Sequence, residues 1–172
     1  MKNKSKDHLA AGAELQVHGG RVPPHTAGEL TPMNGVDYGD IFTLGCPDAS
    51  RWTAEAWGRA MFGDSPDIVE RLIWQGMLNL QLTRRASPDH VAGWPVVDRS
   101  DNHVRLETRS WFLTGNLVVS TRAETVCLGT FVRYDRRVAR AVWLPLSMVH
   151  RGVVPGVLRD AHRRLSTRAA ET

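Results

Sequence analysis

The sequence predicts an α+β domain in which a curved antiparallel sheet wraps around one long C-terminal helix. Two observations support this prediction. Apolar and polar residues alternate with a period of two over residues 103–134, and the period changes to 3.6 beyond residue 137. The chain has 172 residues, which is enough to bury a core as a single domain. A sheet of this shape would enclose a pocket for a small ligand.

Strands and two short helices are expected before the long helix. The helices span Thr53–Phe62 and Asp67–Leu82, and Ser65 followed by Pro66 gives the second helix a cap and a proline at its first position. A hairpin turn is expected at Gly115-Asn116. The expected strands are Val36–Leu44, Trp94–Arg99, His103–Phe112 and the meander Leu117–Tyr134.

The long helix is expected over Arg137–Arg164 and contains two prolines. Pro145 and Pro155 each remove a backbone donor, so they should kink the helix or divide it into segments. Arginines crowd its C-terminal end, where they complement the helix dipole. The net charge is +4, but no nucleic-acid-binding motif accompanies it. The sequence therefore favours a solvated helix end over a nucleic-acid interface. The arginines concerned are Arg159, Arg163, Arg164 and Arg168.

Composition sets the expected boundaries and location. Residues 1–21 are charged and small without an apolar period, so we expect a disordered tail, then a ligand-binding domain over 22–166 and a C-terminal tail over 167–172. The tail lacks the apolar core of a signal peptide, and no run approaches the roughly 18 apolar residues of a membrane span. Cys46 and Cys127 lie far apart and lack CxxC spacing, so two reduced cysteines are a simpler interpretation than a disulfide between them. These features predict a cytoplasmic protein, either a monomer or a homodimer.

Motifs for metals and cofactors are missing from the sequence. Seven histidines are scattered without HExxH spacing, and no cysteine pair begins a zinc site. Phosphate-loop, dinucleotide and GxSxG signatures are also missing. The sequence therefore predicts neither a metal nor a cofactor.

Four short segments, taken together with the element order, carry a family resemblance. They are Asp37-Tyr38-Gly39-Asp40-Ile41-Phe42, Asp101-Asn102-His103-Val104-Arg105, Thr130-Phe131-Val132-Arg133 and Leu144-Pro145-Leu146-Ser147-Met148-Val149-His150-Arg151. On these segments, residues 36–165 resemble the START-like, polyketide-cyclase-like (SRPBCC) superfamily, close to an uncharacterised bacterial family. The resemblance implies the helix-grip fold. It implies no particular reaction, because fold alone does not fix function.

The polar candidates for the pocket are His150, Arg105 and Glu107. His150 lies mid-helix among apolar residues and is either a hydrogen-bonded structural residue or an acid/base group. The strand that carries the other two has two possible orientations. If its polar face is convex, that face is a solvated surface; if it is concave, Arg105 would hold a carboxylate or enolate and Glu107 would move a proton. The face comprises His103, Arg105, Glu107, Arg109 and Trp111.

Large apolar side chains on several elements are expected to line the same pocket. Residues of this kind are more often core than ligand platform, but apolar pockets are built from them with a few polar groups. The expected lining consists of Trp74, Met77, Trp111, Phe131 and Trp143.

These features predict a pocket protein for a small hydrophobic metabolite, with more than one class of function open. One class is a cofactor-independent cyclase, aromatase or isomerase of polyketide-like specialised metabolism, with His150 and Glu107 as the catalytic groups. Such chemistry needs mainly a shaped cavity and an acid/base group. The alternative is a non-catalytic carrier of a lipid or other hydrophobic ligand. A regulatory or interaction protein acting through the basic helix is a third class.

Overall fold

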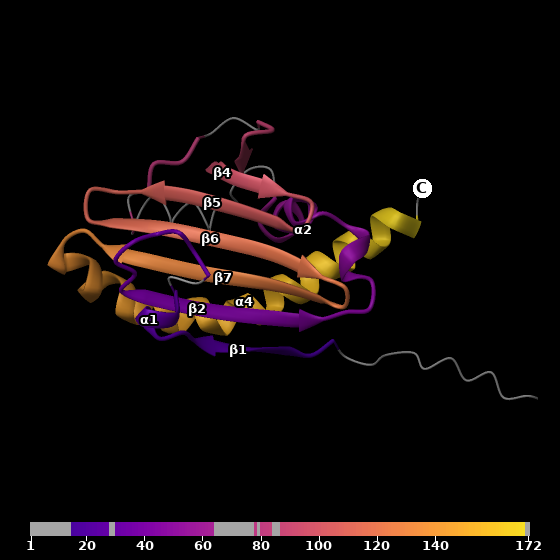
Figure 1. Ribbon diagram of the computed structural model, residues 1–172, viewed down its shortest axis with the longest axis horizontal. Coiled ribbons are helices and arrows are strands. Elements are labelled where there is room, and N and C mark those ends of the chain that lie inside the picture. Colours follow the sequence, from indigo (N-terminus) through magenta and orange to yellow (C-terminus); the bar gives the residue numbers. More distant parts are fainter. Residues whose placement is uncertain (1–14, 28–29, 64–77, 79, 84–86, 171–172) are drawn as a thin grey trace, which may run out of the picture.

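The fold is a seven-stranded antiparallel sheet with a long C-terminal helix lying across one face (Figure 1). The computed structural model describes residues 15–27, 30–63, 78, 80–83 and 87–170. The strand order is β1-β2-β7-β6-β5-β4-β3, so the sheet is open and the early strand β2 pairs with the last strand β7. The predicted α+β class, with an antiparallel sheet and a long C-terminal helix, is confirmed.

Most predicted elements are present in the described part of the chain. The expected helix over Asp67–Leu82 lies mostly outside the described residues, and residues 80–82 are not helical. Thr53 caps the helix predicted after it, because its side chain accepts a hydrogen bond from the Ala56 backbone N–H at 3.1 Å. The strands are β1 (Val17–Arg21), β2 (Tyr38–Gly45), β3 (His90–Val91), β4 (Trp94–Ser100), β5 (His103–Arg109), β6 (Leu113–Arg122) and β7 (Thr125–Tyr134). The helices are α1 (Pro24–Ala27), the 3₁₀ turn η1 (Ala49–Arg51), α2 (Ala54–Phe62) and α4 (Arg137–Ala170).

Strand β1 corrects the expected N-terminal boundary. It lies within the segment 1–21 that was expected to be disordered, yet it pairs with β2 along its whole length. The strand was not predicted because two glycines at its centre interrupt the apolar alternation that is typical of a strand. Gly19 is required there, because a Cβ atom would lie 2.2 Å from the backbone oxygen of Ile41. The ordered domain therefore includes β1, and the rest of the expected tail, residues 1–14, lies outside the described residues.

The turn between β5 and β6 lies at residues 110–112 and not at Gly115-Asn116. Ser110 closes the turn: its N–H donates to the Leu113 carbonyl at 2.8 Å, and its hydroxyl accepts from the Leu113 N–H at 3.2 Å. Gly115 instead lies within β6, where a Cβ atom would be 3.2 Å from the ring of Trp94. This glycine therefore marks close packing between strands and not a turn.

Helix α4 is assigned without a break through Pro145 and Pro155, so the predicted division does not occur. It also continues to Ala170, which replaces most of the expected C-terminal tail at 167–172 with helix. α4 packs against β1, β2, β7 and α2, and this packing stabilises the helix although each proline removes a backbone hydrogen bond. Its buried side chains are Ala139, Trp143, Leu146, Ser147, Val154, Leu158, Ala161 and Leu165.

By length and composition alone, α4 is apolar enough to cross a membrane. An 18-residue window has a mean hydropathy of 1.3, and 28% of that window is buried in the fold. The sequence expectation missed this window because it counted uninterrupted apolar residues, whereas the window tolerates up to two charges. A core helix can meet the same criterion, and α4 packs against the sheet. Its outward face carries the exposed side chains Leu144, Met148, Val149 and Val153.

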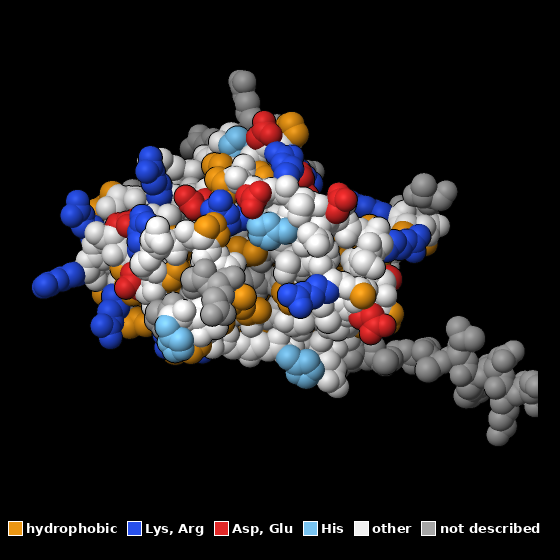
Figure 2. All heavy atoms as spheres, in the orientation of Figure 1, with side chains coloured by type: hydrophobic (Ala, Val, Ile, Leu, Met, Phe, Trp, Pro, Cys, Tyr) orange, Lys and Arg blue, Asp and Glu red, His pale blue; other side chains and the backbone are white. Residues whose placement is uncertain are grey.

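The sheet carries an apolar cluster on each face. The larger cluster lies between the sheet and the helices α2 and α4, and it includes Phe42, Leu128 and Trp143. A smaller cluster lies on the other face, where the segment before β2 contributes side chains that cover the strands. That face is the one turned toward the viewer in Figure 2, where charged side chains of both signs are scattered over it. The smaller cluster consists of Met33, Val36, Val118 and Phe131, with Ile41 packed against it.

Candidate functional site

The predicted site residues do not form one pocket, because the sheet separates them. His150 and Trp143 lie on α4 and face β2 and β7. Arg105 and Glu107 alternate with the core residues of β5 and point to the opposite face, and Phe131 belongs to the smaller cluster on that face. His150 and Glu107 therefore cannot act together on one substrate, as the sequence interpretation required.

The remaining predicted residues do not add to a pocket at α4. Trp111 is 63% exposed at the turn between β5 and β6, and its ring packs edge-on against Phe112 with centroids 5.1 Å apart. Trp74 and Met77 lie outside the described residues. Of the predicted lining, the structure therefore places only Trp143 beside His150 in the part of the chain that it describes.

Glu107 lies instead beside a polar hollow of about 260 Å³ on the face turned away from α4. Arg105 donates to its carboxylate at 3.2 Å, and the Asn116 amide donates to the same oxygen at 2.9 Å. Arg105 and Glu107 thus neutralise each other. A larger surface hollow of about 630 Å³ opens at the start of α4, beside Tyr134, Asp135, Arg136, Arg137 and Arg140. Neither hollow is lined by His150.

His150 belongs to a group of polar side chains between α4 and the sheet, which we call the Asp40 cluster: Tyr38, Asp40, Thr130, Trp143 and His150. Asp40 is fully buried on the α4 side of β2. Tyr38 lies on the same side two residues earlier, and its hydroxyl donates to Asp40 Oδ2. Thr130 is the partner of Asp40 in the β2–β7 register. His150 Nε2 lies 3.0 Å from Thr130 Oγ1 and 3.4 Å from Asp40 Oδ1.

Trp143 of α4 packs against two other members of the Asp40 cluster, Tyr38 and His150. It lies two helical turns before His150 and therefore on the same face of α4. Its ring meets Tyr38 edge-on, with centroids 5.4 Å apart and planes at 78°, and lies 5.8 Å from the His150 ring. His150 keeps 22% of its side chain exposed, so an acid/base group in this cluster is reachable from solvent.

Two buried polar atoms of the Asp40 cluster make no hydrogen bond to the described protein. They are the acceptor Asp40 Oδ1 and the donor Trp143 Nε1. Oδ1 is within ion-pair distance of His150, but the geometry does not satisfy a hydrogen bond. Buried polar atoms are paired in the great majority of folded proteins, so each exception requires a reason. One acceptor and one donor beside the same imidazole are suited to a ligand that carries a hydroxyl, enol or carbonyl oxygen.

The electrostatics of the Asp40 cluster keep the Tyr38 hydroxyl protonated. Burial raises the pKa of Tyr38 well above its usual value, and the hydrogen bond to Asp40 and the charge of that carboxylate raise it further. The charge of Arg151 and the Ser147 hydroxyl oppose this shift only in part. Tyr38 therefore remains a donor that holds one carboxylate oxygen of Asp40 in place.

We expect Tyr38→Phe to lower the free energy of unfolding by about 1–3 kcal/mol, because it leaves a buried carboxylate oxygen without its donor. The same substitution should have little effect in an Asp40→Leu background, where no acceptor remains. Urea denaturation of the four proteins measures the difference. Equal losses in both backgrounds would show that the Tyr38 hydroxyl stabilises the fold through a contact other than Asp40.

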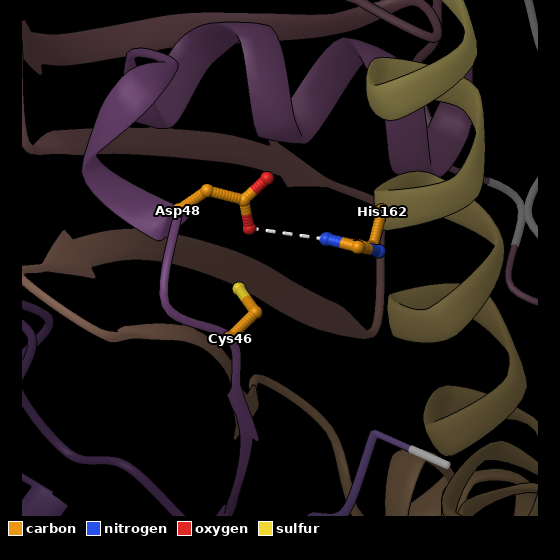
Figure 3. Close-up of side chains that lie close together, drawn as sticks. All are labelled: Cys46, Asp48 and His162. Carbon is orange, nitrogen blue, oxygen red and sulfur yellow. Dashed lines mark hydrogen bonds and ion pairs between the residues drawn. The ribbon is translucent and has the colours of Figure 1, made fainter. Parts of the chain in front are cut away.

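A second group of polar side chains lies at the other end of α4 (Figure 3). The ligand-type atoms of Cys46, Asp48 and His162 lie within 4.8 Å of one another, and His162 Nε2 is 3.1 Å from Asp48 Oδ1. Burial raises the pKa of the Cys46 thiol to about 11, and the charge of Asp48 adds to the shift. A thiol that stays protonated is a poor nucleophile, so this trio does not resemble an activated cysteine–histidine pair.

Sequence reasoning missed Asp40, Cys46, Asp48 and His162. A signal for Asp40 was available, since it alternates with Tyr38, Phe42 and Leu44 and so places a carboxyl group on the apolar side of a strand. The group of Cys46, Asp48 and His162 gave no local signal, because His162 is 114 residues from Asp48 in the sequence.

Comparisons with protein-family models, with curated proteins and with solved structures found no match to this chain.

Proposed function

We propose that this protein binds a small, largely apolar molecule through the Asp40 cluster, and that His150 moves a proton on that molecule. This keeps the class suggested by the sequence, a cofactor-independent isomerase or cyclase, and replaces Glu107 with Asp40 as the partner of the histidine. The observation that carries the proposal is the pair of unpaired buried atoms, Asp40 Oδ1 and Trp143 Nε1, around a histidine that solvent can reach.

The surroundings of the Asp40 cluster suit such a ligand. Tyr38 and Trp143 of the Asp40 cluster belong to the larger apolar core, which also includes Phe42, Leu146 and Val154. Sites of this kind bind apolar molecules through shape and orient them through a few polar groups. Within the same proposal, the finer fold assignment is a helix-grip domain of the polyketide-cyclase-like superfamily, acting in the cytoplasm as a monomer or homodimer.

The proposed proton transfer requires no oxidant, reductant or cofactor. His150 takes a proton from the carbon next to a ketone, and the electron pair of the C–H bond moves to the oxygen as an enolate. The Trp143 N–H is the donor that stabilises the negative oxygen. The proton then returns to the same carbon or to another one, which gives exchange or isomerisation. Attack of the enolate carbon on a second carbonyl of the same molecule would instead close a ring.

Deuterium exchange tests the catalytic step. The chain is incubated in D₂O with a panel of apolar ketones, beginning with 2-tetralone, and loss of the α-proton signal is followed by NMR. We expect exchange above the buffer rate, reduced at least tenfold by His150→Gln and also reduced by Asp40→Asn. His103→Gln is the matched control, because His103 lies on β5 on the face turned away from α4, where its Nδ1 is 3.7 Å from Asp98 Oδ2 of β4.

The result would contradict catalysis if no ketone of the panel exchanged faster than in buffer, or if His150→Gln and His103→Gln behaved alike. The same samples distinguish an enzyme from a non-catalytic carrier. A ketone that raises the melting temperature of the wild type, but not of Trp143→Phe, without any exchange would support binding alone.

A further inference from the structure

The Cys46, Asp48 and His162 side chains have no role in the proposed function. Cys46 and Asp48 lie in the turn that joins β2 to η1, while His162 projects from the C-terminal half of α4 (Figure 3). A thiol, a carboxylate and an imidazole thus converge from two distant parts of the chain. Thiolate sulfur, imidazole nitrogen and carboxylate oxygen are the ligand atoms that zinc takes from proteins. Zinc binding would deprotonate the Cys46 thiol, because a metal ion displaces the proton of a thiol that coordinates it.

We propose that Cys46, Asp48 and His162 form a zinc site with three protein ligands and one position left for water. Zinc bonds of about 2.0–2.3 Å place two ligands of a tetrahedral site roughly 3.3–3.7 Å apart. The 3.1 Å between Asp48 Oδ1 and His162 Nε2 is close to this spacing, and no two of the three ligand atoms are more than 4.8 Å apart. Side-chain adjustments of about 1 Å would complete the geometry.

The elements that carry the ligands are held firmly, as a metal site requires. The Cys46 N–H donates to the Glu124 carbonyl at 2.9 Å, and the Ala49 N–H donates back to the Cys46 carbonyl at 3.2 Å. The imidazole of His162 stacks on Trp57, with centroids 6.1 Å apart and planes at 23°. Backbone hydrogen bonds therefore hold the turn that carries Cys46 and Asp48, and stacking on Trp57 orients the His162 ring.

Access to the proposed site is from one side. Cys46 is 1% exposed, whereas the side chains of Asp48 and His162 are 38% and 19% exposed. An ion would therefore enter past the carboxylate and the imidazole, and the solvent side would hold its water ligand. Bound zinc would join the β2–η1 turn to α4 and should stabilise the fold, because it binds the folded chain preferentially.

Cobalt substitution provides the test, with Co²⁺ as the probe and Zn²⁺ as the competitor on the untagged, chelator-treated chain. Thiolate ligation should give a near-ultraviolet sulfur-to-cobalt charge-transfer band that stoichiometric zinc removes. Cys46→Ser should abolish the band, and His162→Gln should weaken Co²⁺ binding at least tenfold. Cys127→Ser and His103→Gln are the controls. Cys127 is half-buried beside Thr43, at 3.2 Å, and both control variants should keep the band.

Melting curves give a second readout that does not depend on the cobalt spectrum. Zinc should raise the melting temperature of the wild type and of Cys127→Ser by several degrees, and should leave that of His162→Gln almost unchanged. The proposal would be overturned by a missing charge-transfer band, by a band that persists in Cys46→Ser, or by an equal zinc effect on all variants, which would indicate unspecific binding.

Discussion

Replacing Trp57 by alanine should lower the free energy of unfolding by about 3–5 kcal/mol. The Trp57 side chain is fully buried, and its indole N–H donates to the Ala49 carbonyl at 2.9 Å. Truncation would leave a cavity between α2 and α4 and an unpaired carbonyl oxygen in η1. Urea denaturation monitored by far-ultraviolet circular dichroism measures the loss.

Phenylalanine substitutions at two tryptophans provide the matched comparison. Trp57 and Trp143 are both buried, but only the N–H of Trp57 has a hydrogen-bond partner among the described residues. Trp57→Phe should therefore destabilise the fold by about 1 kcal/mol more than Trp143→Phe, the typical net worth of one hydrogen bond. A larger loss at Trp143 would show that its N–H is paired, and would remove one of the two atoms on which the proposed ligand site rests.

Deleting residues 1–21 should lower the melting temperature and promote aggregation. The deletion removes β1 and leaves β2 as an unpaired edge, which can pair with another chain. It also removes the Leu15 carbonyl that accepts from Arg159 of α4 at 3.1 Å. Calorimetry and light scattering measure both effects. A deletion that stops at residue 14 keeps β1 and should behave more like the full chain; equal behaviour of the two deletions would contradict a stabilising role for β1.

Two neighbouring glycines allow the same edge to be tested without a deletion. Gly19→Ala should weaken the pairing of β1, since its Cβ would lie 2.2 Å from the Ile41 carbonyl oxygen. Gly20→Ala is the control, because a Cβ there meets nothing within 4 Å. We expect a loss of about 1–3 kcal/mol for the first variant and a change within about 0.5 kcal/mol for the second.

Local signals in the sequence were sufficient for most of the fold. Alternation over 103–134 reports half-buried strands directly, and Thr53 followed by an amphipathic stretch reports the start of α2. β1 lacked such a signal, because two of its five residues are glycines and its extended form depends on pairing with β2. The predicted turn at Gly115-Asn116 was wrong because glycine occurs in strands at points of close packing as well as in turns.

The candidate site was less predictable than the fold, because it depends on the register between paired strands and on which face of the sheet meets α4. The alternation in β5 separates Arg105 and Glu107 from the core residues, but it does not say which side of the strand meets α4. The pairing of Asp40 with Thr130 follows from the β2–β7 register, which brings together strands from opposite ends of the chain. Only His150 and Trp143 were both predicted as site residues and found, in the described part of the chain, among the groups that now define the site.

The pairing of β2 with β7 also has a consequence for how the chain folds. Strands β4 to β7 follow one another as antiparallel neighbours, so each of their pairings closes a short loop. β2 is synthesised early, but its partner β7 is the last strand of the sheet. The pairing of β2 with β7 therefore closes a loop that spans most of the domain. Such long-range pairing slows folding. During synthesis the Asp40 carboxylate therefore stays in water until β7 and α4 have emerged, and the proposed site is among the last parts of the molecule to form.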